Sequence, residues 1–144
     1  MFSFEFWVRY LKLLSILLTL QGLSWALIGS FDPFGIYDAL FAHAMFGVDV
    51  LPTEVQRAKA FLLGPFGATD AGFFVLFYFI AAHGFARREA WAYRALLAGV
   101  GTWFVVDTIM SLVHGMYFNI YLVNIPAGIL LGLPLFFTRG QFDS

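Results

Sequence analysis

The sequence predicts an all-α fold, a four-helix transmembrane bundle that forms a single membrane domain over residues 1–144. Three observations support this prediction. The chain is 61% hydrophobic and only 12% charged, whereas a soluble domain carries about 25% charged residues. Its mean hydropathy is +0.83. It also contains four apolar segments that reach the roughly 20 residues a helix needs to cross a bilayer, whose interior excludes open strand edges.

The four predicted spans follow one another along the chain. The first covers about residues 7–29, and we expect it to be a retained helix because its apolar run is long and no small-residue cleavage site follows it. The second covers about 61–83, the third about 91–114 and the fourth about 117–137. Residues 30–60, between the first two spans, form the one long loop.

That loop contains a predicted helix of its own. The stretch IYDALFAHAMFG has apolar residues at helical spacing and predicts a short helix lying in the membrane interface. Further along, the stretch PTEVQ predicts a helix start, with Thr53 as the N-cap and Gln56, three residues later, as its capping-box partner. We therefore predict that a helix begins there and continues into the second span.

The distribution of basic residues predicts the orientation. The loop at 30–60 is rich in Asp and Glu, and the HGMYFN link between the third and fourth spans has neither Lys nor Arg. Positive residues accumulate on the cytoplasmic side of membrane proteins, so both termini are predicted to be cytoplasmic. The residues that mark this side are Arg9, Lys12, Arg87, Arg88, Arg94 and Arg139.

Each predicted span carries a strongly polar residue at a similar depth. At a rise of about 1.5 Å per residue, Gln21, Asp70 and Asp107 lie about 12 Å below the outer surface and Asn124 about 7–12 Å below it. A charged Asp at the centre of a membrane helix costs about 2.5–3.5 kcal/mol. We therefore expect both carboxyls to face inward and to be either paired, with polar side chains of this layer or with each other through a shared proton, or neutral.

Two interpretations of the layer are open. In the first it is a binding or proton-handling site, in which Asp107, Ser111 and His114 share one helix face and form a polar track toward the outer surface. In the second the same side chains are hydrogen-bonding contacts between helices, which are common in membrane proteins.

The sequence predicts neither a metal site nor a cofactor, other than a bound lipid or quinone beside the aromatic runs. Cysteine is absent, and His83 and His114 are predicted at opposite faces of the membrane, about 30 Å apart. The net charge of −1 gives no reason to expect a nucleic-acid partner.

Small residues recur every four positions in two spans, a pattern that lets helices approach closely. We interpret them as packing contacts within the bundle, with a partner surface as the alternative for the last pair. They are Gly64, Ala68, Gly72, Gly128 and Gly132.

The last part of the chain, about residues 60–139, resembles small bacterial four-helix integral membrane proteins of uncharacterised function. The features that carry the resemblance are the Gly-rich start of the second span (GPFG), the Arg-rich inner link before Trp91, the WFVVDT segment, and the His-Gly-x-x-Phe-Asn pattern before the last span. The resemblance implies four helices and a bacterial inner (cytoplasmic) membrane. It implies no activity.

These observations favour a non-catalytic integral membrane protein, an accessory or scaffold subunit of a larger membrane complex. Its expected partners are membrane lipids and other membrane subunits or further copies of itself. Two alternatives remain open from the sequence. One is a bundle that binds a lipid, quinone or pigment. The other is a small membrane enzyme or proton-coupled carrier that uses Asp107 and His114.

Overall fold

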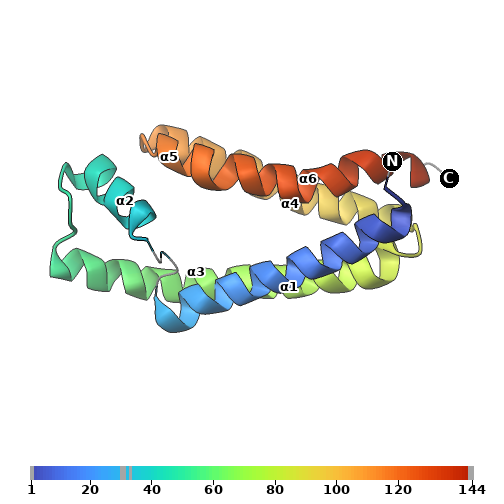
Figure 1. The fold of residues 1–144 in the computed structure, drawn as a ribbon, viewed down its shortest axis with the longest axis horizontal. Coiled ribbons are helices and arrows are strands. Elements are labelled where there is room, and N and C mark those ends of the chain that lie inside the picture. The colour runs from blue at the N-terminus through green and yellow to red at the C-terminus, as the bar shows by residue number, and fades with distance from the viewer. Residues whose placement is uncertain (1, 30–31, 33, 143–144) are drawn as a thin grey trace. The chain divides into compact units, whose positions relative to one another are not determined.

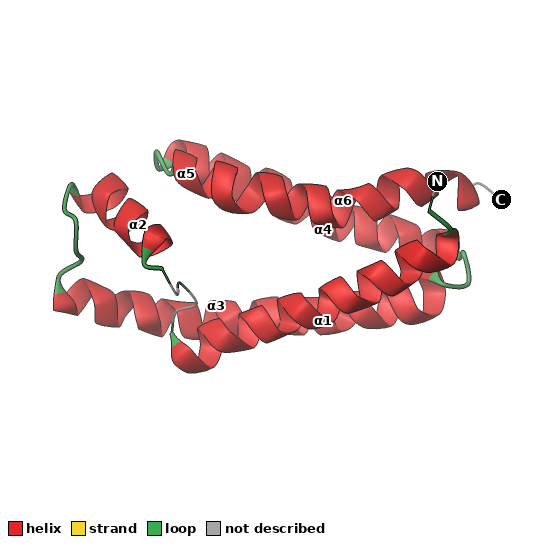
Figure 2. Cartoon of the chain, viewed as in Figure 1, coloured by secondary structure: helices red, strands yellow, loops and turns green. Residues whose placement is uncertain are grey.

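The computed structural model describes residues 2–29, 32 and 34–142, and no strand occurs among them. Its main helices are α1 (Phe4–Ile28), α2 (Ile36–Phe46), α3 (Thr53–Ile80), α4 (Ala90–Val113), α5 (Tyr117–Asn119) and α6 (Ile125–Thr138) (Figures 1 and 2). Short π-helical turns at Ala81–Phe85 and Ile120–Asn124 extend α3 and join α5 to α6, and a 3-10 turn, Arg139–Gln141, follows α6. The predicted all-α class is confirmed.

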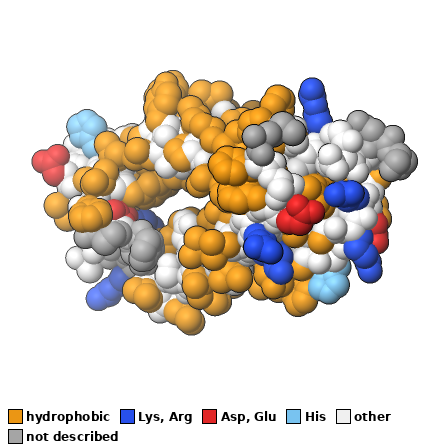
Figure 3. Space-filling model, turned by 45° about the vertical axis from the view of Figure 1, so that its right-hand side comes forward, with side chains coloured by type: hydrophobic (Ala, Val, Ile, Leu, Met, Phe, Trp, Pro, Cys, Tyr) orange, Lys and Arg blue, Asp and Glu red, His pale blue; other side chains and the backbone are white. Residues whose placement is uncertain are grey.

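Four continuous helical segments are long and apolar enough to cross a membrane. They are Phe4–Ile28, Thr53–Phe85, Ala90–Val113 and Tyr117–Gln141. Large hydrophobic side chains are exposed along all of them, and Figure 3 shows hydrophobic side chains over much of the visible face. This is the surface that a lipid environment accepts. The chain is therefore an integral membrane protein, while its predicted orientation stays a prediction.

The loop between the first two spans contains the predicted short helix. α2 lies between Gly35 and Gly47, two glycines with left-handed φ angles of 66° and 65° that let the chain turn at both ends. The Asp32 carboxylate accepts hydrogen bonds from the backbone N–H groups of Ile36 at 3.1 Å and Asp38 at 2.8 Å, which fixes the start of α2. Its interfacial location stays a prediction, and residues 30, 31 and 33 of the predicted loop lie outside the described residues.

α3 begins at Thr53, close to the predicted start, and continues without a break through Pro65 into the second span. The predicted capping box is not formed, because Thr53 is itself helical and the Gln56 side chain donates to the carbonyl of Leu51 at 2.7 Å. Gly64 and Phe66 on either side of this proline are also helical. The helix tolerates Pro65 although it donates no backbone hydrogen bond.

Contacts divide the chain into two compact units. The first, here the terminal unit, is Met1–Ile16 with Phe74–Ser144, and the second, here the internal unit, is Leu17–Phe73. Both α1 and α3 therefore contribute to each unit. We describe the two units separately.

An aromatic cluster closes one end of the terminal unit. Phe85, in the turn after α3, is completely buried and its ring centroid lies 5.6 Å from that of Phe4 and 4.8 Å from that of Phe142. Tyr93 of α4 packs against Phe142 at 4.9 Å. The guanidinium of Arg88 sits over the Phe4 ring at 4.8 Å, a cation–π contact. Segments from the start, middle and end of the chain are thus packed together here.

Candidate functional site

Five polar side chains form one hydrogen-bonded cluster in the terminal unit, here called the Asn119 cluster. The side-chain amide nitrogen of Asn119 lies 3.0 Å from Asp107 Oδ2, 2.9 Å from Ser111 Oγ and 3.4 Å from Asn124 Oδ1. Asn124 in turn donates to Thr108 Oγ1 at 3.0 Å. An amide nitrogen carries two hydrogens, so the bonds to Asp107 and Ser111 are the principal ones.

The Asn119 cluster depends first on the turn after α4. The N–H of Met116 donates to the carbonyl of Ser111 at 2.7 Å, and the N–H of Gly115 donates to that of Leu112 at 3.1 Å. With Gly115 at a left-handed φ of 69°, this is the Schellman arrangement that ends many helices. The chain reverses within a few residues, so that α4 and α6 pack against each other (Figure 1) and Asn119 returns to the level of Ser111.

The π-helical turn at Ile120–Asn124 completes the cluster. In an α-helix at about 100° per residue, side chains five positions apart point about 140° away from each other. A π turn bonds residue i to residue i+5 and brings such residues toward one face. Asn119 and Asn124 consequently both point at α4, where Asp107, Thr108 and Ser111 lie within about one helical turn.

Burial and bonding determine what the cluster can do. Asn124 is fully buried and Ser111 is 5% exposed, while Asp107 is half-buried. Every side chain in the cluster has a hydrogen-bond partner, and the donor to Asp107 is the amide of Asn119 rather than a cation. Such a network stabilises a helical hairpin. The cluster thus joins α4 to the helix that follows it.

His114 does not join the Asn119 cluster. It lies at the end of α4 with its side chain exposed, and its Nδ1 is 2.9 Å from the carbonyl oxygen of Met110, one turn earlier in its own helix. The polar track predicted from Asp107 through Ser111 to His114 thus stops at Ser111. Among the described residues, no group of three His, Asp or Glu side chains is placed to hold a metal ion.

Gln21 and Asp70 lie in the internal unit, where α1 and α3 approach each other closely. A Cβ placed on Gly22 would be 2.7 Å from the backbone nitrogen of Ala71 and 2.8 Å from the carbonyl oxygen of Gly67, closer than real Cβ atoms come. The same Cβ on Gly22 would lie 3.0 Å from Asp70 Oδ2. The carboxyl of Asp70 therefore sits beside the residue that follows Gln21.

Neither of these two polar side chains is satisfied in the way that Asp107 is. Within the described chain, no hydrogen bond or ion pair reaches the Asp70 carboxyl or the Gln21 side-chain amide. Both side chains are half-buried. A single layer that unites them with Asp107 and Asn124 stays a prediction.

The small residues singled out in the sequence differ in their surroundings. A Cβ on Gly128 would lie 2.9 Å from the ring of Phe104, so α4 and α6 pack closely there. A Cβ on Gly64, Gly72 or Gly132 would meet nothing within 4 Å, and Ala68 is exposed.

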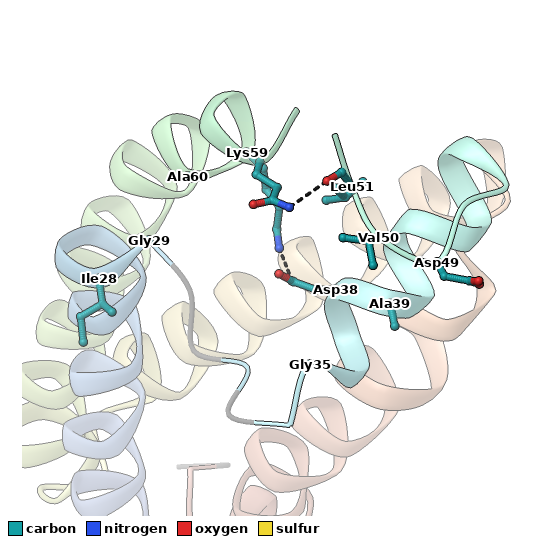
Figure 4. Close-up of a pocket in the computed structure, with 11 residues that line it drawn as sticks. Ile28, Gly29, Gly35, Asp38, Ala39, Asp49, Val50, Leu51, Lys59 and Ala60 are labelled. Carbon is teal, nitrogen blue, oxygen red and sulfur yellow. Dashed lines mark hydrogen bonds and ion pairs between the residues drawn. The ribbon is translucent and has the colours of Figure 1, made fainter. Parts of the chain in front are cut away.

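The internal unit also contains a cavity of about 430 Å³ where α1 ends and α3 begins. Lys59 forms an ion pair with Asp38 inside it, and Gln56 donates to the carbonyl of Leu51 at 2.7 Å (Figure 4). Its walls are formed by Ile28, Gly29, Gly35, Asp38, Ala39, Asp49, Val50, Leu51, Gln56, Lys59 and Ala60.

Sequence reasoning missed three residues that organise these sites. The sequence assigns Asn119 no role of its own within the HGMYFN link, although its position eight residues after Ser111, across a Gly turn, places it opposite that residue. Gly22 and Gly67 lie outside the predicted stripes of small residues. The one available signal was their position relative to the predicted layer, because Gly22 directly follows Gln21 and Gly67 precedes Asp70 by three residues.

No protein-family model matches the chain, and neither a curated protein nor a solved structure is significantly similar to it. Function therefore rests on the sites themselves.

Proposed function

We propose that this integral membrane protein is a non-catalytic accessory subunit of a larger membrane assembly, and that it docks to its partner through the Asp70 side of α3. We place it in a bacterial inner membrane with both termini in the cytoplasm. The observation that carries the proposal is the Asp70 carboxyl, which is half-buried and has no hydrogen bond or ion pair within the described residues.

An unpaired aspartate in a spanning helix needs an explanation. A charged Asp at the centre of a membrane helix costs about 2.5–3.5 kcal/mol, and such residues mark functional contacts by default. Gln21, which is also unpaired and lies at the same helix crossing, adds an amide donor and acceptor. Together they offer a carboxyl and an amide to another helix.

The cation that would pair with Asp70 is not supplied by its own unit. On α3 the nearest basic residue is Lys59, eleven positions earlier and therefore about 16 Å along the helix, and it already pairs with Asp38. A second copy of the chain would bring a second Asp70 to the same face, which is an acceptor of the same sign. The expected partner is therefore a transmembrane helix that carries Lys or Arg at the depth of Asp70.

The terminal unit supports a scaffold role rather than chemistry. Its intramembrane polar groups bond to each other in the Asn119 cluster, and His114 bonds to its own helix. A hairpin that satisfies its polar groups internally can present apolar faces to lipid and to neighbouring subunits.

Photocrosslinking in the native membrane tests the docking face. Phe66 lies one turn before Asp70 and is 54% exposed; replacing it with p-benzoylphenylalanine keeps its benzyl group. The matched probe at Ala68, also exposed, points about 200° away from that at Phe66 on the helix. We expect a stoichiometric crosslink from position 66 that is absent from position 68, to a protein with a basic residue in a spanning segment.

Substitution of Asp70 tests whether the crosslink and the bound partner depend on its carboxyl. Asp70→Leu should abolish the crosslink and the co-purification of the partner, while Asp49→Leu, outside the spans, should leave both unchanged. Recovery of the wild-type chain without a stoichiometric partner would contradict the proposal. So would a complex that survives Asp70→Leu intact.

A further inference from the structure

The cavity of the internal unit combines a charged interior with an apolar rim. Lys59 and Asp38 form an ion pair within it, and the side chain of Lys59 is only 15% exposed. Ile28 and Val50, which also line it, are 75% and 74% exposed. A volume of about 430 Å³ lies within the roughly 300–1,000 Å³ of small-molecule sites.

The position of the cavity suits the headgroup level of a membrane. Gly29 directly follows α1, which is one of the four candidate spans, so the cavity opens where this span ends. Gly29 lies beside Ala60 of α3, so the first two turns of α3, from Thr53 onward, extend past the end of α1. Lys59 and Gln56 lie on those turns. Apolar side chains on the rim would then contact the first methylenes of acyl chains, and the polar interior would face the headgroups.

Both partners of the ion pair can form further hydrogen bonds. Lys59 carries three N–H donors, of which one is directed at Asp38 Oδ1. The other carboxylate oxygen of Asp38 has no hydrogen bond within the described residues. The backbone N–H of Asp38 donates to the Asp32 carboxylate at 2.8 Å, and the Asp38 side chain is 43% exposed. Figure 4 shows the carboxyl of Asp49 turned away from Lys59.

We infer that this cavity binds a phosphoethanolamine headgroup, with the phosphate on Lys59 and the primary ammonium on Asp38. A zwitterion can lie antiparallel to the Lys59–Asp38 pair, so that each of its charges meets an opposite one. Phosphate or phosphoglycerol would place no positive charge beside Asp38, so its carboxylate would face an anion. Choline lacks the N–H groups that would hydrogen-bond to Asp38. This site is independent of the Asp70 docking face.

Native mass spectrometry of the purified, delipidated full-length chain tests the inference. The probes are phosphatidylethanolamine, phosphatidylcholine and phosphatidylglycerol with identical acyl chains, added at equal concentration. We expect one phosphatidylethanolamine to be retained in about tenfold preference over each of the others, because the bonds to both charged partners are charge-assisted. Equal retention of the three lipids, or a preference for either of the other two, would overturn the inference without any variant.

Variants then assign the preference to the cavity. Lys59→Gln and Asp38→Asn should each reduce the preference to near unity, whereas Arg57→Gln and Glu54→Gln, on the same turns of α3 but outside the cavity, should preserve it. A preference that persists in both cavity variants would overturn the assignment. Soluble phosphoethanolamine separates two sources of the same headgroup: competition by it indicates a site for the free compound as well, and its failure to compete assigns the site to the lipid.

Discussion

The Asn119 cluster and the Gly22–Gly67 crossing hold their helices together by different means. In the terminal unit, α4 and the following helix are joined by side-chain hydrogen bonds around Asn119. In the internal unit, α1 and α3 meet backbone to backbone through two glycines. Each region contains one intramembrane aspartate, yet only Asp107 has a partner in the described chain.

The two regions accommodate a carboxyl in an apolar helix in different ways. Asp107 is followed by a tight turn that returns an amide to its level, so its partner lies close in sequence. Asp70 lies beside Gly22, and a glycine brings no donor side chain. Close packing of backbones and satisfaction of a polar side chain therefore compete for the same position. The first region is self-contained, and the second is left with a group for another molecule to satisfy.

The largest expected change in stability comes from Gly22→Val, which disturbs backbone packing without removing a polar side chain. Gly22→Val would place side-chain atoms against the backbone of Ala71 and Gly67, and we expect a loss of about 3 kcal/mol in the free energy of unfolding. Gly72→Val on α3, where a Cβ meets nothing within 4 Å, should change it by less than about 0.5 kcal/mol. Reversible unfolding in mixed micelles measures both. Similar values for the two variants would show that Gly22 does not mark a close approach.

The second-largest expected change is a gain in stability. Asp70→Leu should raise the free energy of unfolding of the isolated chain by about 2 kcal/mol, because it removes an unsatisfied acid from a spanning helix. The same variant should lose the partner proposed above, whereas Asp49→Leu should do neither. An isolated chain destabilised by Asp70→Leu would reveal an internal partner and count against docking at this position.

Loss of the central amide should weaken the hairpin. Asn119→Leu leaves Asp107 Oδ2 and Ser111 Oγ without their shared donor, and we expect the free energy of unfolding to fall by about 1.5 kcal/mol. Tyr121→Leu, two positions along and 67% exposed, is the matched control and should have little effect. If the two variants behave alike in the same micelle assay, the cluster contributes nothing to stability.

The smallest effect concerns His114. It is exposed and bonds only to the carbonyl of Met110 in its own helix, so His114→Ala should change the free energy of unfolding by less than about 0.5 kcal/mol. A loss as large as that expected for Asn119→Leu would bring His114 into the cluster and revive the polar track that the sequence suggested.

Much of the fold could be predicted because hydrophobic length dominates it. The four spans, the short helix now seen at Ile36–Phe46 and the start of α3 at Thr53 all follow from apolar runs and from local start signals. These features depend on each segment alone. The rotation of a helix about its own axis cannot be predicted from that segment alone, because contacts with the neighbouring helix set it. For that reason the glycines that make the close crossing, Gly22 and Gly67, could not be told from those in the regular stripes.

The site was predictable only as far as α-helical periodicity holds. Asp107 and Ser111 share a helix face at a spacing of four, and the structure joins both through Asn119. Asn119 and Asn124 are five apart, and an α-helix would turn them away from each other. Only the π-helical turn between them gathers both at α4, and its residues, IYLVN, have no feature that distinguishes such a turn from ordinary helix.

Two double-mutant cycles in the isolated chain test the central contrast most directly. The cycle of Asp107→Ala with Asn119→Ala should give a coupling energy of about 1 kcal/mol, as expected for a hydrogen bond between membrane helices. The cycle of Asp70→Ala with Gln21→Ala should give a coupling close to zero. Equal couplings, or a larger one for Asp70 and Gln21, would contradict the account that one aspartate is satisfied within the chain and the other is not.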